Sequence, residues 1–121
     1  MHAILAINRK VILVCDVPEI GYDVVRFYLM QSRFPQLTND LDFRPTIEEY
    51  NKRQTDVLQM LDELGRLSNV TLVHPQSRMF DENGRGEIIV DGKLLYCDDD
   101  HLSQFGAHYV SPVFDEVFKA M

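Results

Sequence analysis

The segment KVILVCDVPE (residues 10–19) is the stretch from which the fold is predicted. Its apolar run from Val11 to Cys15 is rich in β-branched side chains and is closed by Pro18. A continuous run of this kind is typical of a strand buried on both faces of a parallel sheet. We therefore expect an α/β protein with this strand inside its sheet.

Two further segments read as strands. The segment NVTLVHP (residues 69–75) is a second apolar run ended by a proline, which predicts another buried strand. In EIIVDGKLLY (residues 87–96), Asp91-Gly92 separates two apolar runs, and this dipeptide is the strongest short signal for a β-hairpin.

Helices are predicted between and after these strands. A short helix opens at Asp23 and ends before Pro35, and a loop follows over residues 36–45. Thr46 and Glu49 form a capping-box pattern at the start of a longer amphipathic helix that stops near Gly65.

The C-terminal segment predicts a helix capped by Ser103 and running towards Phe118. Pro112 lies inside this pattern, so we expect either a kink or a fresh start capped by Ser111. Only two strands suit a parallel sheet, whereas a doubly wound sheet usually has about four or five. The fold class predicted is therefore a partial three-layer, flavodoxin-like α/β fold with a parallel sheet and a small hairpin.

Size and charge narrow the possible partners. The chain has 121 residues, which suits one domain, and a net charge of −7. Because its basic residues occur singly or in pairs, we expect neither a nucleic acid nor an anionic membrane as a partner. Its longest apolar runs are far shorter than a membrane span, and the order of charges at the start is wrong for a signal peptide. Alone, such a chain is expected to be soluble and cytosolic.

The two cysteines, Cys15 and Cys97, form no recognisable motif. They lie far apart in the sequence without C-x-x-C spacing, which gives no support to a redox motif or a zinc ribbon. Whether they pair is left open, with free, partly buried thiols as the simpler interpretation.

The residues with most chemical potential are Asp98, Asp99, Asp100 and His101, which stand side by side just before the last helix. Asp98 and His101 have the spacing D-x-x-H. A carboxylate at this distance across a turn can accept the Nδ1 proton of the imidazole and leave Nε2 free as a base. The same four residues could instead form a solvated turn or bind a metal ion.

The metal interpretation is the weakest of the three. Neighbouring residues of an extended segment face opposite sides, so three consecutive carboxylates cannot all reach one ion, and no calcium-loop pattern is present. We therefore expect no metal and no cofactor. His74 follows a predicted strand, a position at which α/β proteins often bind ligands. A structural role is nevertheless the simpler interpretation for a single histidine before a proline. His108 is expected to be an exposed helix residue, and His2 carries no signal.

Two blocks together resemble a known family. VILVCDVPEIGYDVV (residues 11–25), followed near the C-terminus by LYCDDDHLSQFGAHYVSPVF (residues 95–114), is similar to the SGNH (GDSL-type) hydrolase fold. More narrowly, the chain resembles the SGNH domain at the C-terminus of bacterial membrane acyltransferases of the acyltransferase-3 family. The family patterns are V-P-E-x-G-x-D-V after a strand and D-D-D-H-L-S followed by G-A. This resemblance implies that Asp98 orients a catalytic base, His101, in a serine triad. The side chains of Asp99 and Asp100 are then expected to point away from His101.

The sequence also departs from that family. An SGNH enzyme needs a serine in a G-D-S block and an asparagine in a G-x-N-D block, and these build the nucleophile and oxyanion hole. No Gly-Asp-Ser occurs here, and Asn39 in the segment TND follows the first strand instead of preceding it. The chain is therefore expected to be one partial domain over residues 1–121, the C-terminal half of an SGNH domain that is inactive alone.

Three functions remain open at this point. The resemblance implies an O-acyltransferase that passes an acyl group such as acetyl from a donor to a carbohydrate acceptor. The alternatives are an SGNH esterase or lipase, which gives the acyl group to water, and a truncated, non-catalytic remnant. A membrane would be a partner only through a missing acyltransferase part, which would place the domain outside the cytoplasm. Because the predicted strand of residues 11–15 lacks enough neighbours, we expect the isolated chain to self-associate.

Overall fold

The computed structural model describes residues 2–35 and 42–119, and it has an α/β order. The elements are α1 (His2–Leu5), β1 (Val11–Val14), α2 (Val24–Arg33), α3 (Ile47–Arg53), α4 (Thr55–Gly65), β2 (Val70–Val73), the 3-10 helix η2 (Pro75–Arg78), β3 (Ile89–Val90), β4 (Lys93–Leu94), α5 (Gln104–Val110), the 3-10 helix η3 (Ser111–Phe114) and α6 (Asp115–Lys119). Asn39 and most of the predicted loop lie outside the described residues.

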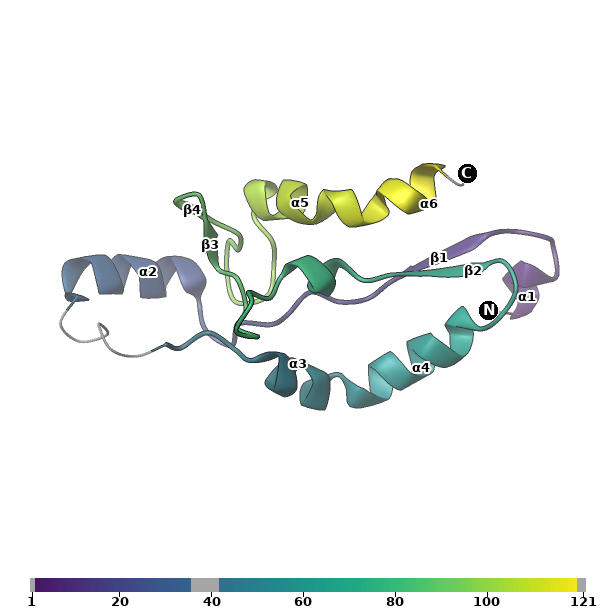
Figure 1. Cartoon of the computed structure of the whole chain (residues 1–121), viewed down its shortest axis with the longest axis horizontal. Coiled ribbons are helices and arrows are strands. Elements are labelled where there is room, and N and C mark those ends of the chain that lie inside the picture. Colours follow the sequence, from purple (N-terminus) through teal and green to yellow (C-terminus); the bar gives the residue numbers. More distant parts are fainter. Residues whose placement is uncertain (1, 36–41, 120–121) are drawn as a thin grey trace.

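The two apolar strands form the middle layer of the molecule. β1 and β2 pair in parallel, with Val11 opposite Val70 and Val14 opposite Val73. Helices α3 and α4 lie on one side of this sheet, and α5 and α6 lie on the other (Figure 1). This arrangement confirms the prediction of a partial α/β fold with a parallel sheet and a separate hairpin.

The prediction that β1 is buried on both faces is wrong for the described structure. Ile12 is 38% exposed and Val14 is 49% exposed, while Val11 and Leu13 are half-buried. The physical reason is that the helices do not cover the sheet completely. A groove of about 460 Å³ remains between Ile12 on the sheet and Val117 on α6. A two-stranded sheet is too narrow for the helices to seal it.

Local capping signals are confirmed at two helix starts. Asp23 caps α2 by accepting a hydrogen bond from the Arg26 amide, and Thr46 and Glu49 form the predicted capping box at α3. The long helix expected after Thr46 is divided at Gln54 into α3 and α4. The Thr55 hydroxyl donates to the Asn51 carbonyl at 2.7 Å, a side-chain bond that competes with regular helix geometry.

The hairpin and the last helix follow their sequence signals with one correction. Asp91 and Gly92 both have positive φ, 52° and 75°, as a two-residue hairpin turn of the primed type requires. Ser103 caps α5 through the Gly106 amide. Pro112 ends α5 at Val110, and the chain restarts as η3, but Ser111 does not cap it. The Ser111 hydroxyl instead donates to the carbonyl of His108.

The buried core lies beyond the carboxyl ends of β1 and β2. It joins the segment after β1, the hairpin and α5, and its members are Ile20, Val24, Met79, Leu95, Tyr96 and Val110. Both cysteines are free, Cys15 buried and Cys97 exposed. Among residues 2–35 and 42–119, no helix has the length and apolar character needed to cross a membrane.

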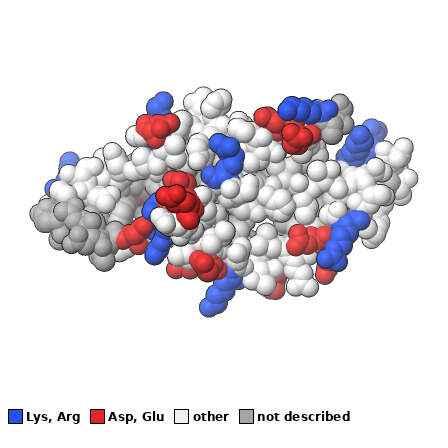
Figure 2. Space-filling view, in the orientation of Figure 1, with Lys and Arg blue, Asp and Glu red and all other residues white. Residues whose placement is uncertain are grey.

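Surface charges are mixed. On the face shown in Figure 2, basic side chains lie singly or beside acidic ones and form no continuous basic patch. This distribution agrees with the scattered lysines and arginines of the sequence.

Candidate functional site

A tight turn between the hairpin and α5 carries the acidic cluster and His101. The Cys97 amide donates to the His101 carbonyl at 2.9 Å and closes the turn, and Tyr96 and Leu102 form an isolated bridge beside it. The Ser103 amide donates to the Leu95 carbonyl at 2.8 Å. The turn is therefore fixed at both ends by the backbone.

Gly106 lets α5 approach the end of the hairpin. A Cβ atom at this position would collide with the Leu95 carbonyl, so any other residue would push the helix away. The Ser103 hydroxyl donates to the Leu94 carbonyl at 2.7 Å and tightens the same contact. The S-x-x-G spacing of the sequence thus sets the start of α5, and with it the position of His101.

The segment after β1 supports the turn from the other side. The Ile20 amide donates to the Asp99 carbonyl at 2.8 Å, and the Tyr96 hydroxyl donates to the Pro18 carbonyl at 2.7 Å. Tyr96 is 1% exposed, and burial raises the pKa of its phenol, which therefore remains a hydrogen-bond donor. Two sequence blocks far apart in the chain therefore meet, and they do so beyond the carboxyl ends of the strands.

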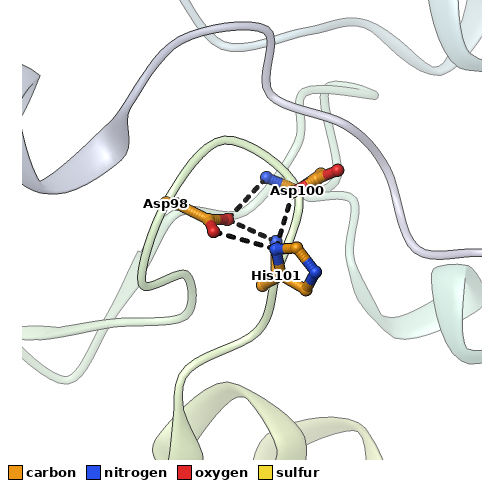
Figure 3. A group of neighbouring side chains, drawn as sticks. All are labelled: Asp98, Asp100 and His101. Atoms are coloured by element: carbon orange, nitrogen blue, oxygen red, sulfur yellow. Dashed lines mark hydrogen bonds and ion pairs between the residues drawn. The ribbon is translucent and has the colours of Figure 1, made fainter.

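Asp98 and His101 form the central pair of the site. Oδ2 of Asp98 lies 2.8 Å from Nδ1 of His101, as the D-x-x-H spacing predicted (Figure 3). Oδ1 of Asp98 accepts the backbone amides of His101 at 2.7 Å and Asp100 at 3.0 Å. These backbone hydrogen bonds, first that of His101 and then that of Asp100, lower the pKa of Asp98 to about 2. Asp98 is therefore a fixed carboxylate at neutral pH.

The expectation that Asp100 points away from His101 is wrong. Its Oδ1 also lies 2.8 Å from Nδ1 of His101, so two carboxylates share one ring nitrogen (Figure 3). The physical reason is that these residues form a turn, in which Oδ1 of Asp98 accepts the amides of Asp100 and His101 and brings both residues to one carboxylate. The aspartate itself was a signal in the sequence, because its side chain often accepts the backbone amide two residues on. No ion pair of the described residues joins Asp99 to His101.

The two carboxylates act differently on the imidazole. The hydrogen bond that Nδ1 of His101 donates to Asp98, followed by the charge of Asp100, raises the pKa of His101 above its usual value. Partial desolvation and the neighbouring charge of Asp99 raise the pKa of Asp100. Asp98 is thus the firmly ionised partner and Asp100 the weaker one. With Nδ1 occupied, Nε2 is left for chemistry on a side chain that is 73% exposed.

A comparison with known families gives a match over nearly the whole chain. The family model "SGNH domain (fused to AT3 domains)" matches residues 1–116. The chain belongs to this family. A search of curated proteins and a search of solved structures each found no match.

Asp98, Asp100 and His101 of this SGNH domain also lie close enough together to be considered as a metal site. Ligand atoms of Asp98, Asp100 and His101 lie within 4.8 Å of one another. Both carboxylates, however, contact the same nitrogen, Nδ1, which is the geometry for holding the proton on that nitrogen. The contacts thus describe an oriented imidazole.

The other histidines are separate from this pair. Nδ1 of His74, at the end of β2, lies 3.3 Å from Sγ of Cys15 and 3.2 Å from Nε2 of Gln76. His108 is exposed on α5, and His2 is exposed in α1. No hydrogen bond or ion pair of the described residues links any of them to Asp98 or His101.

Most serine hydroxyls of this SGNH domain are hydrogen-bonded to the backbone. Four of its five serine hydroxyls donate to a main-chain carbonyl; they are Ser32, Ser77, Ser103 and Ser111. Ser103, the closest in sequence to His101, also accepts the Gly106 amide as the helix cap. Its hydroxyl is therefore engaged as donor and acceptor and does not present a nucleophile to His101.

Proposed function

We propose that this chain supplies the base and the orienting carboxylate of a Ser-His-Asp triad in an SGNH O-acyltransferase domain that modifies a carbohydrate. The observation that carries the proposal is the contact of 2.8 Å between Oδ2 of Asp98 and Nδ1 of His101. That contact selects the tautomer with the proton on Nδ1, which leaves a lone pair on Nε2. Membership of a family fused to AT3 domains supports the acyltransferase assignment.

The proposed chemistry uses His101 twice. As the serine hydroxyl attacks the carbonyl carbon of the acyl donor, Nε2 takes its proton and then gives it to the leaving group. In the second half-reaction, Nε2 takes the proton of a sugar hydroxyl, and that oxygen attacks the acyl-serine. The proton returns to the serine oxygen as the sugar ester is released. Asp98 stabilises the imidazolium formed in each half-reaction without accepting its proton.

In this proposal, the serine nucleophile comes from outside residues 1–121. No Gly-Asp-Ser block occurs in the sequence, and the hydroxyl of Ser103 is engaged with the backbone. The open groove along β1 and β2 also supports a partial domain over residues 1–121. In this account, an N-terminal SGNH half brings the serine, the oxyanion hole and the remaining strands.

The test completes the domain and then removes the base. The 121-residue chain alone should turn over nitrophenyl acetate no faster than free imidazole, because nucleophile, base and oxyanion hole act as a unit. Joined to an N-terminal SGNH half with a Gly-Asp-Ser block, fused or in trans, it should gain activity. His101→Ala should then lower the rate by about two to four orders of magnitude, while His108→Ala, a matched exposed histidine, should not.

Two outcomes would reject the assignment. One is full activity of His101→Ala in the completed domain, and the other is ester turnover by the short chain that depends on His74. Mass spectrometry of the products separates the two enzyme classes, because an acyltransferase yields an acylated saccharide and an esterase yields only free acid.

A further inference from the structure

A second concave site lies between α2, the hairpin and the residues that precede α3. Its cavity is about 400 Å³ in volume, within the size range of small-molecule sites. It lies next to the His101 turn, because the Val24 amide that begins α2 donates to the Asp98 carbonyl at 3.5 Å and Val24 itself lines the cavity. The triad proposed above uses none of its residues.

The walls of this cavity are aromatic. Tyr22 packs against Phe27 with ring centroids 4.7 Å apart, and Phe27 packs edge-on against Phe43 at 5.4 Å. Tyr28 and Phe43 remain 40% and 45% exposed although they line a cavity. Exposed aromatic faces at a concave surface can cover the apolar C–H face of a ring-shaped ligand.

Polar groups that have no hydrogen-bond partner among the described residues accompany these rings. The Gln31 amide and the hydroxyls of Tyr22 and Tyr28 line the cavity and make no hydrogen bond to other described residues. Burial, and then the charge of Asp42, raise the pKa of Tyr22, so its phenol stays protonated and can donate. The cavity thus offers both donors and acceptors beside its apolar walls.

The one cation of the cavity is already neutralised among the described residues. Nε and Nη2 of Arg44 donate to the two oxygens of Asp42 at 3.0 and 2.8 Å, and Nη1 donates to Asp81 at 2.9 Å. An anionic ligand would have to compete with both carboxylates for this guanidinium. A purely apolar ligand would leave Gln31 and the tyrosine hydroxyls without partners.

From these features we infer that the cavity binds a neutral saccharide. A sugar ring has apolar C–H faces for Phe43 and Tyr28, and it has hydroxyls for Gln31 and Tyr22. If the proposed function holds, the saccharide is part of the acyl acceptor, held beside the turn that carries His101. The binding of a neutral sugar in this cavity does not depend on the triad.

Saturation-transfer NMR tests the inference on the 121-residue chain, and it also works if the chain self-associates. The probes are maltotetraose and chitotetraose, with hexanoate and a galacturonic acid oligomer as the apolar and anionic comparisons. We expect transfer to ring protons of at least one neutral oligosaccharide. Phe43→Ala and Gln31→Ala should each weaken its binding by about tenfold, which corresponds to one aromatic or hydrogen-bond contact. Phe34→Ala, an equally exposed aromatic at the end of α2 outside the cavity, should not.

The inference fails if neither neutral oligosaccharide receives saturation at about 10 mM, if hexanoate or the galacturonic acid oligomer binds in their place, or if Phe43→Ala binds like Phe34→Ala. Failure of the triad is a different result, because His101→Ala should leave saccharide binding unchanged. Sugar binding without His101-dependent turnover would keep the cavity and reject the triad, and the reverse combination would reject only the cavity.

Discussion

Two regions of this chain differ in how well they are packed: the turn that carries His101 and the β1–β2 sheet. Around the turn, Tyr96 and Val24 are each 1% exposed and Leu95 is fully buried, and backbone hydrogen bonds reach the turn from two directions. In the sheet, Ile12 and Val14 are 38% and 49% exposed. The sheet has the more apolar sequence of the two, because the turn contains three aspartates and a histidine, so composition does not explain the difference.

The difference lies in where the packing partners are located in the sequence. The turn packs against residues 16–24 and the hairpin, all within this chain. A parallel sheet needs strands on both sides and helices on both faces, and this chain supplies two strands. The comparison indicates that the Asp98–His101 pair is assembled locally, whereas the sheet requires further strands.

The largest expected effect concerns the two carboxylates at Nδ1. In the completed domain, Asp98→Asn should lower the rate by about two orders of magnitude or more, because the amide would favour the wrong tautomer. Asp100→Asn should lower it less than about tenfold, because Asp98 still holds the proton and an exposed ion pair contributes little. Steady-state kinetics of both variants measures this ratio. Equal effects would contradict the assignment of Asp98, and not Asp100, as the carboxylate that orients His101.

The next effect concerns the support of the turn. Tyr96→Phe removes the donor to the Pro18 carbonyl inside the core, which should cost about 1–3 kcal/mol of unfolding free energy. The matched control is Tyr109→Phe. Tyr109 is a half-buried residue of α5, and its hydroxyl makes no hydrogen bond to the described residues. Denaturant titration compares them. If Tyr96→Phe is as stable as the control, the segment after β1 does not hold the turn.

A smaller effect is expected from the open sheet. Val14→Lys places a charge on the exposed edge region of β1 and should shift the isolated chain towards the monomer, because edge lysines block strand addition. Thr71→Lys on β2 replaces a side chain that is already polar and should change the distribution less. Sedimentation velocity measures both. A wild-type chain that is a sharp monomeric species with a cooperative thermal transition would contradict the account of an incomplete sheet.

The sequence predicted the local features of this fold well. The capping residues Asp23, Thr46 and Ser103 and the Asp91-Gly92 turn act through hydrogen bonds or dihedral preferences of a few neighbouring residues, so their effects can be read from short patterns. The division at Gln54 was missed because a single hydroxyl, that of Thr55, competes with the helix.

The site was only partly predictable for a different reason. The Asp98–His101 contact lies within one turn and followed from spacing. The second carboxylate, Asp100, was missed because the segment was treated as extended, whereas residues 97–100 bend around the Asp98 carboxylate. The aromatic cavity could not be predicted, since it joins Tyr22, Phe43 and Leu94, which come together only in the tertiary fold.

The most direct test of the central claim is the titration of His101, followed by nitrogen-15 NMR in the isolated chain. The claim is that this chain alone holds the imidazole ready, with Nδ1 protonated and two carboxylates beside it. We predict a pKa above the usual histidine value, a neutral form with the proton on Nδ1, and a lower pKa in Asp98→Asn. As a base, His101 then becomes available only as the pH rises through that raised pKa. An ordinary pKa with the proton on Nε2, unchanged by Asp98→Asn, would contradict the claim.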